Sequence, residues 1–366
     1  FNVLRRKAKF SVDDSGEKRM LHPSPPSVTP RSCSPPLPIG FHHYSVKSKY
    51  AHSFTAIKQP VKARFPTDQK PGESEFILPA HVQSITSTSN PFIKHCVKLA
   101  RSSPYRHSHG SVLVVGTTPI REILQFQESL PSKTVEVEYL FLLDRTDVPP
   151  GLENCSARHL RVSALVLKKL SQIQSTESLE AVALMKHPTS YCVLDDGRDG
   201  DCTKWFPSAR RILVLEGIQD PGNLGTLLRS AVAFNWDGVF FLPGCCDPLS
   251  GKSLRASRGA AFQLPIVSGN WSHLEALRNH FQMKMLAGHP HNDLVSVSQL
   301  SQRLADSMSE TPLCLLLGNE AHGLSDKAQN TFELVSIPMS GDYESLNVAV
   351  AGGIFLYMLQ SPDHRT

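Results

Sequence analysis

Short apolar runs alternate with helix-like segments over two stretches of the chain. In the first stretch, the runs SVLVVG at 111–116 and EYLFLLD at 138–144 have the length and composition of buried strands. Residues 118–127 and 163–173 place their apolar side chains at helical spacing. This pattern predicts a small α/β domain over residues 76–194.

The second stretch contains further apolar runs, each separated from the next by a segment with helical spacing. Strands that are hydrophobic on both faces are typical of a parallel sheet covered by helices on both sides. We therefore predict an α/β domain with a mostly parallel sheet over residues 208–366, and a linker at 195–207 that begins with the acidic segment DDGRDGD. The apolar runs are RILVLEG, GVFFLPG, QLPIV, KMLAG, LCLLLGNE and LVSIPMSG.

The most apolar stretch, residues 348–359, is shorter than the roughly 20 residues that a membrane-spanning helix needs. We interpret it as a buried helix that is surrounded by protein on nearly all sides, and we expect no membrane association. The formal net charge of +5 favours an anionic partner such as nucleic acid without requiring one.

The amino-terminal segment has the composition of an organellar transit peptide. Residues 20–67 contain no Asp or Glu, and their positive charge is spread among many Ser and Pro residues. We expect residues 1–75 to be a disordered presequence that targets the chloroplast rather than the mitochondrion; a basic tail that contacts RNA in the cytoplasm is the alternative. The cations are Arg31, Lys47, Lys49, Lys58, Lys62 and Arg64.

The eight cysteines show no C-x-x-C pair and no regular spacing, so we expect neither a zinc site nor a disulfide framework. Mostly buried thiols in a reducing compartment explain them most simply. The segments RHSHG and HPHN lack partner ligands at zinc spacing, and we interpret their histidines as polar loop residues rather than metal ligands.

The first loop with candidate chemistry is QDPGNLGTLLRSA at 219–231, directly after an apolar strand. Apolar residues recur from Leu224 at i, i+3, i+4, i+7 and i+8, which predicts a core-facing helix. We expect Asn223 at or near its N-cap. Because helical side chains lean toward the N-terminus, Arg229 can reach back over the glycines to the loop. On spacing alone, a plain capped turn explains the same residues.

Two further loops follow strands in the same way. Gly318 permits a close approach of the backbone, and Glu320 after it either binds a substrate hydroxyl or pairs with a cation such as Arg229. In the third loop we expect Ser345 as the N-cap and Asn347 in the first helical turn. Polar groups from three loops thus gather at the carboxyl ends of strands, where open α/β sheets bind ligands. The chain has neither a G-x-G-x-x-G motif nor a phosphate-binding P-loop.

Together the three loops resemble, in order, the three motifs of the SpoU (TrmH-like) family of RNA ribose 2′-O-methyltransferases in the SPOUT class, over residues 211–360. The resemblance implies a trefoil knot at the carboxyl end of the sheet and an active site completed across a homodimer interface. It also implies S-adenosylmethionine as the cofactor, bent in the knot and contacted largely by backbone. The matching segments are DPGNLGTLLRSAVAFNWDGVFFL, LLLGNEAHGLSD and SIPMSGDYESLNVAVAGGIFLYML.

The resemblance also assigns site residues. A guanidinium with a pKa above about 12 is a poor base, so we expect Arg229 to bind a phosphate and stabilise charge on oxygen, with Asn223, Glu320 and Asn347 holding the geometry. The positions that match the family's catalytic residues are Asn223, Arg229, Glu320, Ser345 and Asn347. The positions that match its cofactor-binding residues are Gly318, Asn319, Glu320, Ile337, Met339 and Leu346.

Residues 76–194 resemble the ribosomal-protein-like RNA-binding domain of many family members, which favours rRNA over tRNA as the substrate. Two sets of cations at helical steps predict contacts with RNA phosphates, although solvated helix faces explain such sets as well. A catalytically silent ribosome-assembly factor and an unrelated nucleotide-binding enzyme remain as alternatives. The first set is Lys94, Lys98, Arg101 and Arg106, and the second set is Lys252, Arg255 and Arg258.

Overall fold

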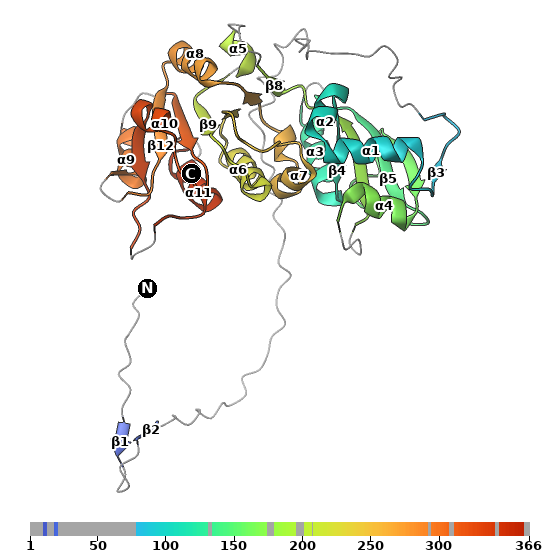
Figure 1. Ribbon diagram of the computed structural model, residues 1–366, viewed down its shortest axis with the longest axis horizontal. Coiled ribbons are helices and arrows are strands. Elements are labelled where there is room, and N and C mark those ends of the chain that lie inside the picture. The colour runs from blue at the N-terminus through green and yellow to red at the C-terminus, as the bar shows by residue number, and fades with distance from the viewer. Residues whose placement is uncertain are drawn as a thin grey trace, which may run out of the picture. The chain divides into compact units, whose positions relative to one another are not determined.

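The computed structural model divides into two units, residues 1–46 and residues 47–366 (Figure 1). In the first unit, β1 (Phe10–Val12) pairs antiparallel with β2 (Lys18–Met20). Apart from these two strands, the presequence expected at 1–75 lies outside the described residues. The structure describes residues 10–12, 18–20, 78–130, 134–173, 179–194, 201–206, 208–291, 294–306, 311–340 and 344–361.

The small sheet of the second unit has five strands in the order β3-β6-β5-β7-β4. Its first three strands run parallel, while β7 pairs antiparallel with both β5 and β4. The strands are β3 (Ser84–Ile85), β4 (Ser111–Val115), β5 (Val137–Leu143), β6 (Arg158–Val162) and β7 (Ala181–Lys186). The helices are α1 (Pro91–Arg101), α2 (Ser103–His109), α3 (Thr117–Glu128) and α4 (Ala164–Ser171).

Both faces of the small sheet are covered, which explains why its central strands read as continuous apolar runs. Successive side chains of a strand point to opposite faces. Val112 and Val114 of β4 therefore join the core that contains Ile123 of α3. Leu113 and Val115 join the core under α1 and α4, the two helices drawn in front of this sheet in Figure 1.

The large sheet has eight strands in the order β13-β15-β12-β14-β9-β10-β11-β8, and every pair is parallel. The predicted α/β class with a mostly parallel sheet is confirmed; the knot stays a prediction. The strands are β8 (Tyr191–Val193), β9 (Arg211–Leu215), β10 (Gly238–Phe241), β11 (Ile266–Ser268), β12 (Lys284–Gly288), β13 (Val295–Ser296), β14 (Leu313–Leu317) and β15 (Glu333–Ser336).

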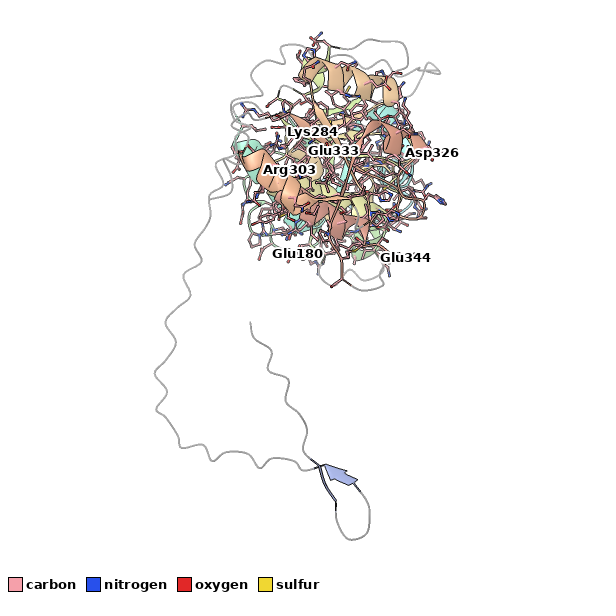
Figure 2. All side chains as sticks on the ribbon, turned by 90° about the vertical axis from the view of Figure 1, so that its left-hand side faces the viewer. Glu180, Lys284, Arg303, Asp326, Glu333 and Glu344 are labelled. Atoms are coloured by element: carbon pink, nitrogen blue, oxygen red, sulfur yellow. The ribbon has the colours of Figure 1, made fainter. Side chains whose placement is uncertain are left out.

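Helices enclose the large sheet, so that β9, β10 and β14 are buried along their whole length. Across the neighbouring strands β12 and β15, Lys284 and Glu333 lie side by side in Figure 2 and form an ion pair of 3.0 Å. The helices are α5 (Cys202–Trp205), α6 (Pro221–Ala233), α7 (Gly251–Ser257), α8 (Trp271–Phe281), α9 (Val297–Asp306), α10 (Asp326–Thr331) and α11 (Val348–Met358), with a short 3₁₀ turn at Ala260–Phe262.

The connection between the two sheets differs from the predicted boundary. We expected residues up to 194 in the small domain, yet β8 pairs with β11 of the large sheet. Within the expected linker at 195–207, residues 195–200 and 207 lie outside the described part, and the rest contains α5, whose Trp205 is buried in the core of the large sheet. The large sheet thus begins before the predicted linker.

Helix α11 was expected to be surrounded by protein on nearly all sides, and this expectation is wrong for the chain by itself. Val350 and Tyr357 are 54% and 56% exposed. The opposite side of the helix packs so closely on α6 that a Cβ on Gly352 would collide with Leu227. Among the described residues, no helix has the length and apolar content to cross a membrane.

Candidate functional site

A cavity of about 640 Å³ lies at the carboxyl ends of β12, β14 and β15 and is closed by the start of α11. A volume of this size suits a small-molecule ligand. The loops that follow these three adjacent strands meet there because all three strands are parallel. Every predicted cofactor-binding residue lines this cavity, namely Gly318, Asn319, Glu320, Ile337, Met339 and Leu346.

Asn319 shapes the turn that follows β14. Its Oδ1 accepts hydrogen bonds from the backbone N–H groups of Ala321 and His322, at 2.8 and 3.0 Å. Its Nδ2 donates to the Gly217 carbonyl at 2.6 Å, which ties this turn to the loop after β9. Since both ends of the amide are engaged within the protein, the Asn319 side chain fixes the loop that carries Glu320.

The helix after β9 begins earlier than predicted. Asp220 is the N-cap of α6, and its Oδ1 accepts from the backbone N–H of Asn223 at 2.7 Å. Pro221 occupies the first helical position, where its missing N–H costs no hydrogen bond. Asn223 is therefore not the N-cap, and its side chain remains available for contacts with the other loops.

Asn223, Glu320 and Asn347, here called the polar cluster, come from three different loops and form one hydrogen-bonded chain. Asn347 Nδ2 donates to Asn223 Oδ1 at 3.1 Å, and Asn223 Nδ2 donates to Glu320 Oε1 at 3.2 Å. The Glu320 carboxylate also accepts from the backbone N–H groups of Gln219 and Asp220, each at 3.3 Å. The cluster thus fixes the three loops against one another at the edge of the cavity.

Asn347, rather than Ser345, is the N-cap of α11. Its Oδ1 accepts from the backbone N–H groups of Ala349 and Val350, at 2.9 and 3.3 Å. Because the oxygen caps the helix, the amide nitrogen must point away from the helix, toward Asn223. Ser345 lies two residues before the cap, is exposed and lines the cavity.

Arg229 is separate from the polar cluster. It is exposed on α6 and does not line the cavity. Within the described part of the chain its side chain has no hydrogen-bond or ion-pair partner, and Glu320, which we considered as a partner, binds Asn223 and backbone instead. The guanidinium donors are therefore not engaged within that part of the chain.

The loop after β12 also belongs to the cavity, although we did not predict it. His289 and His291 line the cavity, and their rings stack with centroids 4.9 Å apart. Burial lowers the pKa of His289 below its usual value, and the neighbouring His291 lowers it further. The signal was the position of HPHN directly after the apolar run KMLAG, on a strand adjacent to the one that precedes Gly318.

The first set of predicted RNA-binding cations divides into two groups. Lys94, Lys98 and Arg101 are exposed along one face of α1. Arg106, which we placed on the same face, is only 3% exposed and forms an ion pair with Asp247. Its expected role in contacting phosphate is therefore wrong.

The second set does not form one continuous helical stripe. Lys252 is exposed and Arg255 is half-buried, and burial lowers the pKa of Arg255. Helix α7 ends at Ser257, so Arg258 lies beyond it in a left-handed conformation, where its guanidinium pairs with Glu122 of α3 at 2.7 Å. Of these three cations, Lys252 alone is exposed and Arg255 and Arg258 are partly buried.

Within the described residues, no group of three or more His, Cys, Asp and Glu side chains could hold a metal ion. The cysteines of the same part are free thiols, and Cys96, Cys202 and Cys314 are buried.

Comparison with known proteins connects this site to one family. The family model described as the SpoU rRNA Methylase family matches residues 210–357. An uncharacterized tRNA/rRNA methyltransferase of Synechocystis sp. is 31% identical over 285 residues, which cover 76% of this chain and 94% of the relative. The 23S rRNA (guanosine(2553)-2′-O)-methyltransferase RlmP of Bacillus subtilis is 27% identical over 285 residues, which cover 76% of this chain and 100% of the relative. The mitochondrial rRNA methyltransferase 3A of Danio rerio is 25% identical over 300 residues, which cover 71% and 66%.

Solved structures share the fold. An RNA 2′-O ribose methyltransferase superposes with a TM-score of 0.58 at 28% identity, over 75% of this chain and 97% of the other. An rRNA methyltransferase from Sinorhizobium meliloti, solved with bound AdoMet, gives a TM-score of 0.59 at 22% identity, over 76% and 97%.

Proposed function

The chain belongs to the SpoU rRNA methylase family, and we propose that it transfers the methyl group of S-adenosylmethionine to a ribose 2′-hydroxyl of RNA. The observation that carries this proposal is the polar cluster, in which one side chain from each of three loops meets at the edge of a ligand-sized cavity. The relative from Bacillus subtilis, named as a 2′-O-methyltransferase, supports the ribose as the acceptor.

S-adenosylmethionine is the cofactor, and the cavity suits it. Two glycines let its walls pack closely: a Cβ on Gly288 would lie 2.8 Å from the Phe355 ring, and one on Gly318 would collide with the Gly323 backbone. Ile337, Met339 and Leu346 supply apolar lining. Bound there, the cofactor supplies an electrophilic methyl group on a sulfonium.

The residues of the chain bind and orient the RNA. Methyl transfer requires the acceptor oxygen in line with the S–CH3 bond, and much of the rate enhancement comes from holding that geometry. Arg229, whose donors have no partner within the described part of the chain, binds a phosphate next to the target ribose. It stabilises the negative charge that develops on the 2′-oxygen as the hydroxyl proton passes to solvent. The polar cluster holds the loops in place, and Ser345 lies at the cavity, where it contacts the ribose.

A second copy of this chain completes the site. Val350 and Tyr357 give α11 an exposed apolar face, and Leu346, at 38% exposed, continues it to the cavity. Exposed apolar side chains gathered on one element are typical of interaction surfaces. A homodimer that buries this face would bring residues of its partner next to the cofactor.

We further propose rRNA of an organelle as the substrate, with tRNA as the second candidate. Relatives whose names include rRNA support rRNA as the substrate. The mitochondrial relative from Danio rerio supports an organelle as the location. The acid-free segment at 20–67 favours the chloroplast.

The experiment is a methylation assay with S-adenosylmethionine labelled on its methyl group. The full chain is incubated with unmodified large-subunit rRNA transcript and, separately, with unmodified tRNA. The proposal predicts label in rRNA that resists alkaline hydrolysis at one linkage, because a 2′-O-methyl group blocks attack on the adjacent phosphate. Cofactor binding without any labelled RNA would favour a silent ribosome-assembly factor instead.

A further inference from the structure

Arg106 is a buried cation that the proposed reaction does not use. It lies on α2, only 3% exposed, and its guanidinium is held by the protein on two sides. Nη1 donates to the carbonyl groups of Leu99 and Ala100, at 2.7 and 3.1 Å. Nη2 donates to Asp247 Oδ2 at 2.5 Å. A buried charge held in this way has a fixed position.

Asp247 is as firmly held as its partner. Its carboxylate also accepts from the Ser103 hydroxyl at 2.5 Å and from the backbone N–H of Leu249 at 2.7 Å, and its side chain is 13% exposed. Burial by itself would raise the pKa of Asp247, but the Arg106 guanidinium and these hydrogen bonds lower it below its usual value. Arg106 and Asp247, here called the junction pair, therefore form a charged link between the helices of the small sheet and the loop after β10.

The loop that carries Asp247 touches the loop of the candidate active site. The backbone N–H of Cys246 donates to the Ile218 carbonyl at 2.8 Å. Gly244 packs so closely that a Cβ on it would lie 3.2 Å from Gly217 Cα. Gly217 in turn accepts the Asn319 hydrogen bond, so one continuous set of contacts leads from Asp247 to the turn that carries Glu320.

On its other side, the junction pair adjoins the basic face of α1. Helix α2 begins directly after α1 ends, with Ser102 between them, and Arg106 binds the last carbonyl groups of α1. That helix exposes Lys94, Lys98 and Arg101. Phosphate contacts fix the register of a nucleic acid on a protein. A rigid link between these cations and the polar cluster therefore determines which ribose reaches the cavity.

We propose that the junction pair is a positioning device that sets the distance between RNA bound on the exposed face of α1 and the polar cluster. The proposal rests on the proposed function, since it assigns a role in selecting the target nucleotide of that reaction. Arg106 and Asp247 touch neither cofactor nor RNA; they act through α1 and through the loop at 217–223.

The first test measures coupling and needs no activity. Hydrogen–deuterium exchange of the full chain is compared between wild type, Asp247→Asn and the control Asp144→Asn, an exposed carboxylate in the small domain. We expect Asp247→Asn to speed exchange about tenfold in both α2 and residues 217–223, while β14 stays protected. Unchanged exchange at 217–223 would overturn the proposal, because the pair would then not hold the active-site loop.

The second test separates positioning from a merely structural role. Arg106→Met/Asp247→Leu replaces both charges by apolar side chains, and we expect it to fold because no buried charge is left unpaired. Its methylation of a large-subunit rRNA transcript is compared with that of a short oligoribonucleotide around the nucleotide that the wild type labels. We expect kcat/KM to fall about tenfold or more for the transcript only, with cofactor affinity unchanged.

An equal loss on both RNAs, or no loss on either, would contradict the proposal. A wild-type protein that labels no RNA would count against the proposed function itself, and the exchange experiment would still decide whether the junction pair holds the loop.

Discussion

We predicted phosphate contacts for both Arg229 and Arg106, but the structure gives the two side chains opposite surroundings. Arg229 is exposed on α6, and its side chain has no hydrogen-bond or ion-pair partner in the described part of the chain. Arg106 is buried and makes hydrogen bonds to three residues. An arginine whose guanidinium N–H groups are unpaired within the protein can bind a ligand. An arginine whose N–H groups are paired within the protein holds structural elements together.

The acidic partners show the same contrast. Glu320 of the polar cluster is exposed and accepts bonds of 3.2 to 3.3 Å from neutral groups, whereas Asp247 is buried against a charged guanidinium. The polar cluster is thus held by neutral donors at an exposed carboxylate, while the junction pair is held by a charge-assisted contact that is largely shielded from solvent. Four predictions test this difference, and the strongest effect comes first.

The largest effect is expected when the junction pair is broken on one side. Asp247→Ala leaves the Arg106 charge buried without a counterion, which should lower the free energy of unfolding by about 3 to 5 kcal/mol. Arg106→Met/Asp247→Leu removes both charges and should cost much less. Urea unfolding monitored by circular dichroism measures both values, and a loss below about 1 kcal/mol for Asp247→Ala would contradict the buried ion pair.

Arg229→Ala should lower turnover strongly and leave the free energy of unfolding nearly unchanged, in contrast to Asp247→Ala. Loss of a group that stabilises developing charge lowers turnover by about 100- to 1000-fold, whereas an exposed side chain contributes little to stability. Arg229→Lys should restore little of the turnover, because an ammonium group lacks the planar pair of N–H donors with which a guanidinium binds phosphate. Single-turnover methylation and urea unfolding of the same preparations check both parts. Near wild-type turnover of the lysine variant would refute the proposed role.

The third prediction concerns pH and the histidines beside the junction pair. Burial lowers the pKa of His187 from 6.5 to about 4, and repulsion from His107 adds to this shift. Below pH 6.5 the unfolded chain binds a proton that the folded chain does not bind until about pH 4, so stability is complete above pH 6.5 and declines as the pH falls toward 4.

The slope for His187 should approach about 1.4 kcal/mol per pH unit in this window. His187→Gln cannot titrate and should remove this part of the slope. Urea unfolding at a series of pH values measures the difference between wild type and variant. Parallel pH profiles of the two proteins would show that His187 is not buried in its neutral form.

The smallest effect is expected on the exposed face of α1. Lys98→Ala should weaken RNA binding and reduce the slope of log K against log salt by about 0.7 to 0.9, the contribution of one phosphate contact. Lys252→Ala tests the single exposed cation of the second set in the same way. Fluorescence anisotropy with the rRNA transcript over a range of salt concentrations measures the slopes. An unchanged slope for Lys98→Ala would show that Lys98 on the exposed face of α1 contacts solvent and not an RNA phosphate.

The positions of strands could be predicted from the sequence. The first residue of each helix and the burial of charged side chains could be predicted less well. Buried parallel strands are continuous apolar runs, and for that reason β4 and β9 appear where SVLVVG and RILVLEG predict them. Several residues able to cap a helix stand close together in each loop. The expectation of Asn223 at or near the N-cap did not use the signal of Pro221, which favours the first helical position and so indicates Asp220 as the cap.

Arg106 could not have been placed correctly from its own neighbourhood. Its counterion lies 141 residues farther along the chain, and helical spacing carries no information about a contact so distant. The polar cluster was predictable because its residues follow strands in separate motifs. Its hydrogen bonds were not, since they depend on which oxygen caps α11.

The central claim is that the polar cluster belongs to an active site for methylation of a ribose hydroxyl. The most direct measurement is mass spectrometry of nucleosides from rRNA transcript that the wild-type protein has methylated with S-adenosylmethionine. We expect one 2′-O-methylnucleoside, in an amount that Arg229→Ala reduces strongly. A nucleoside methylated on its base, or a ribose product unaffected by that substitution, would contradict it.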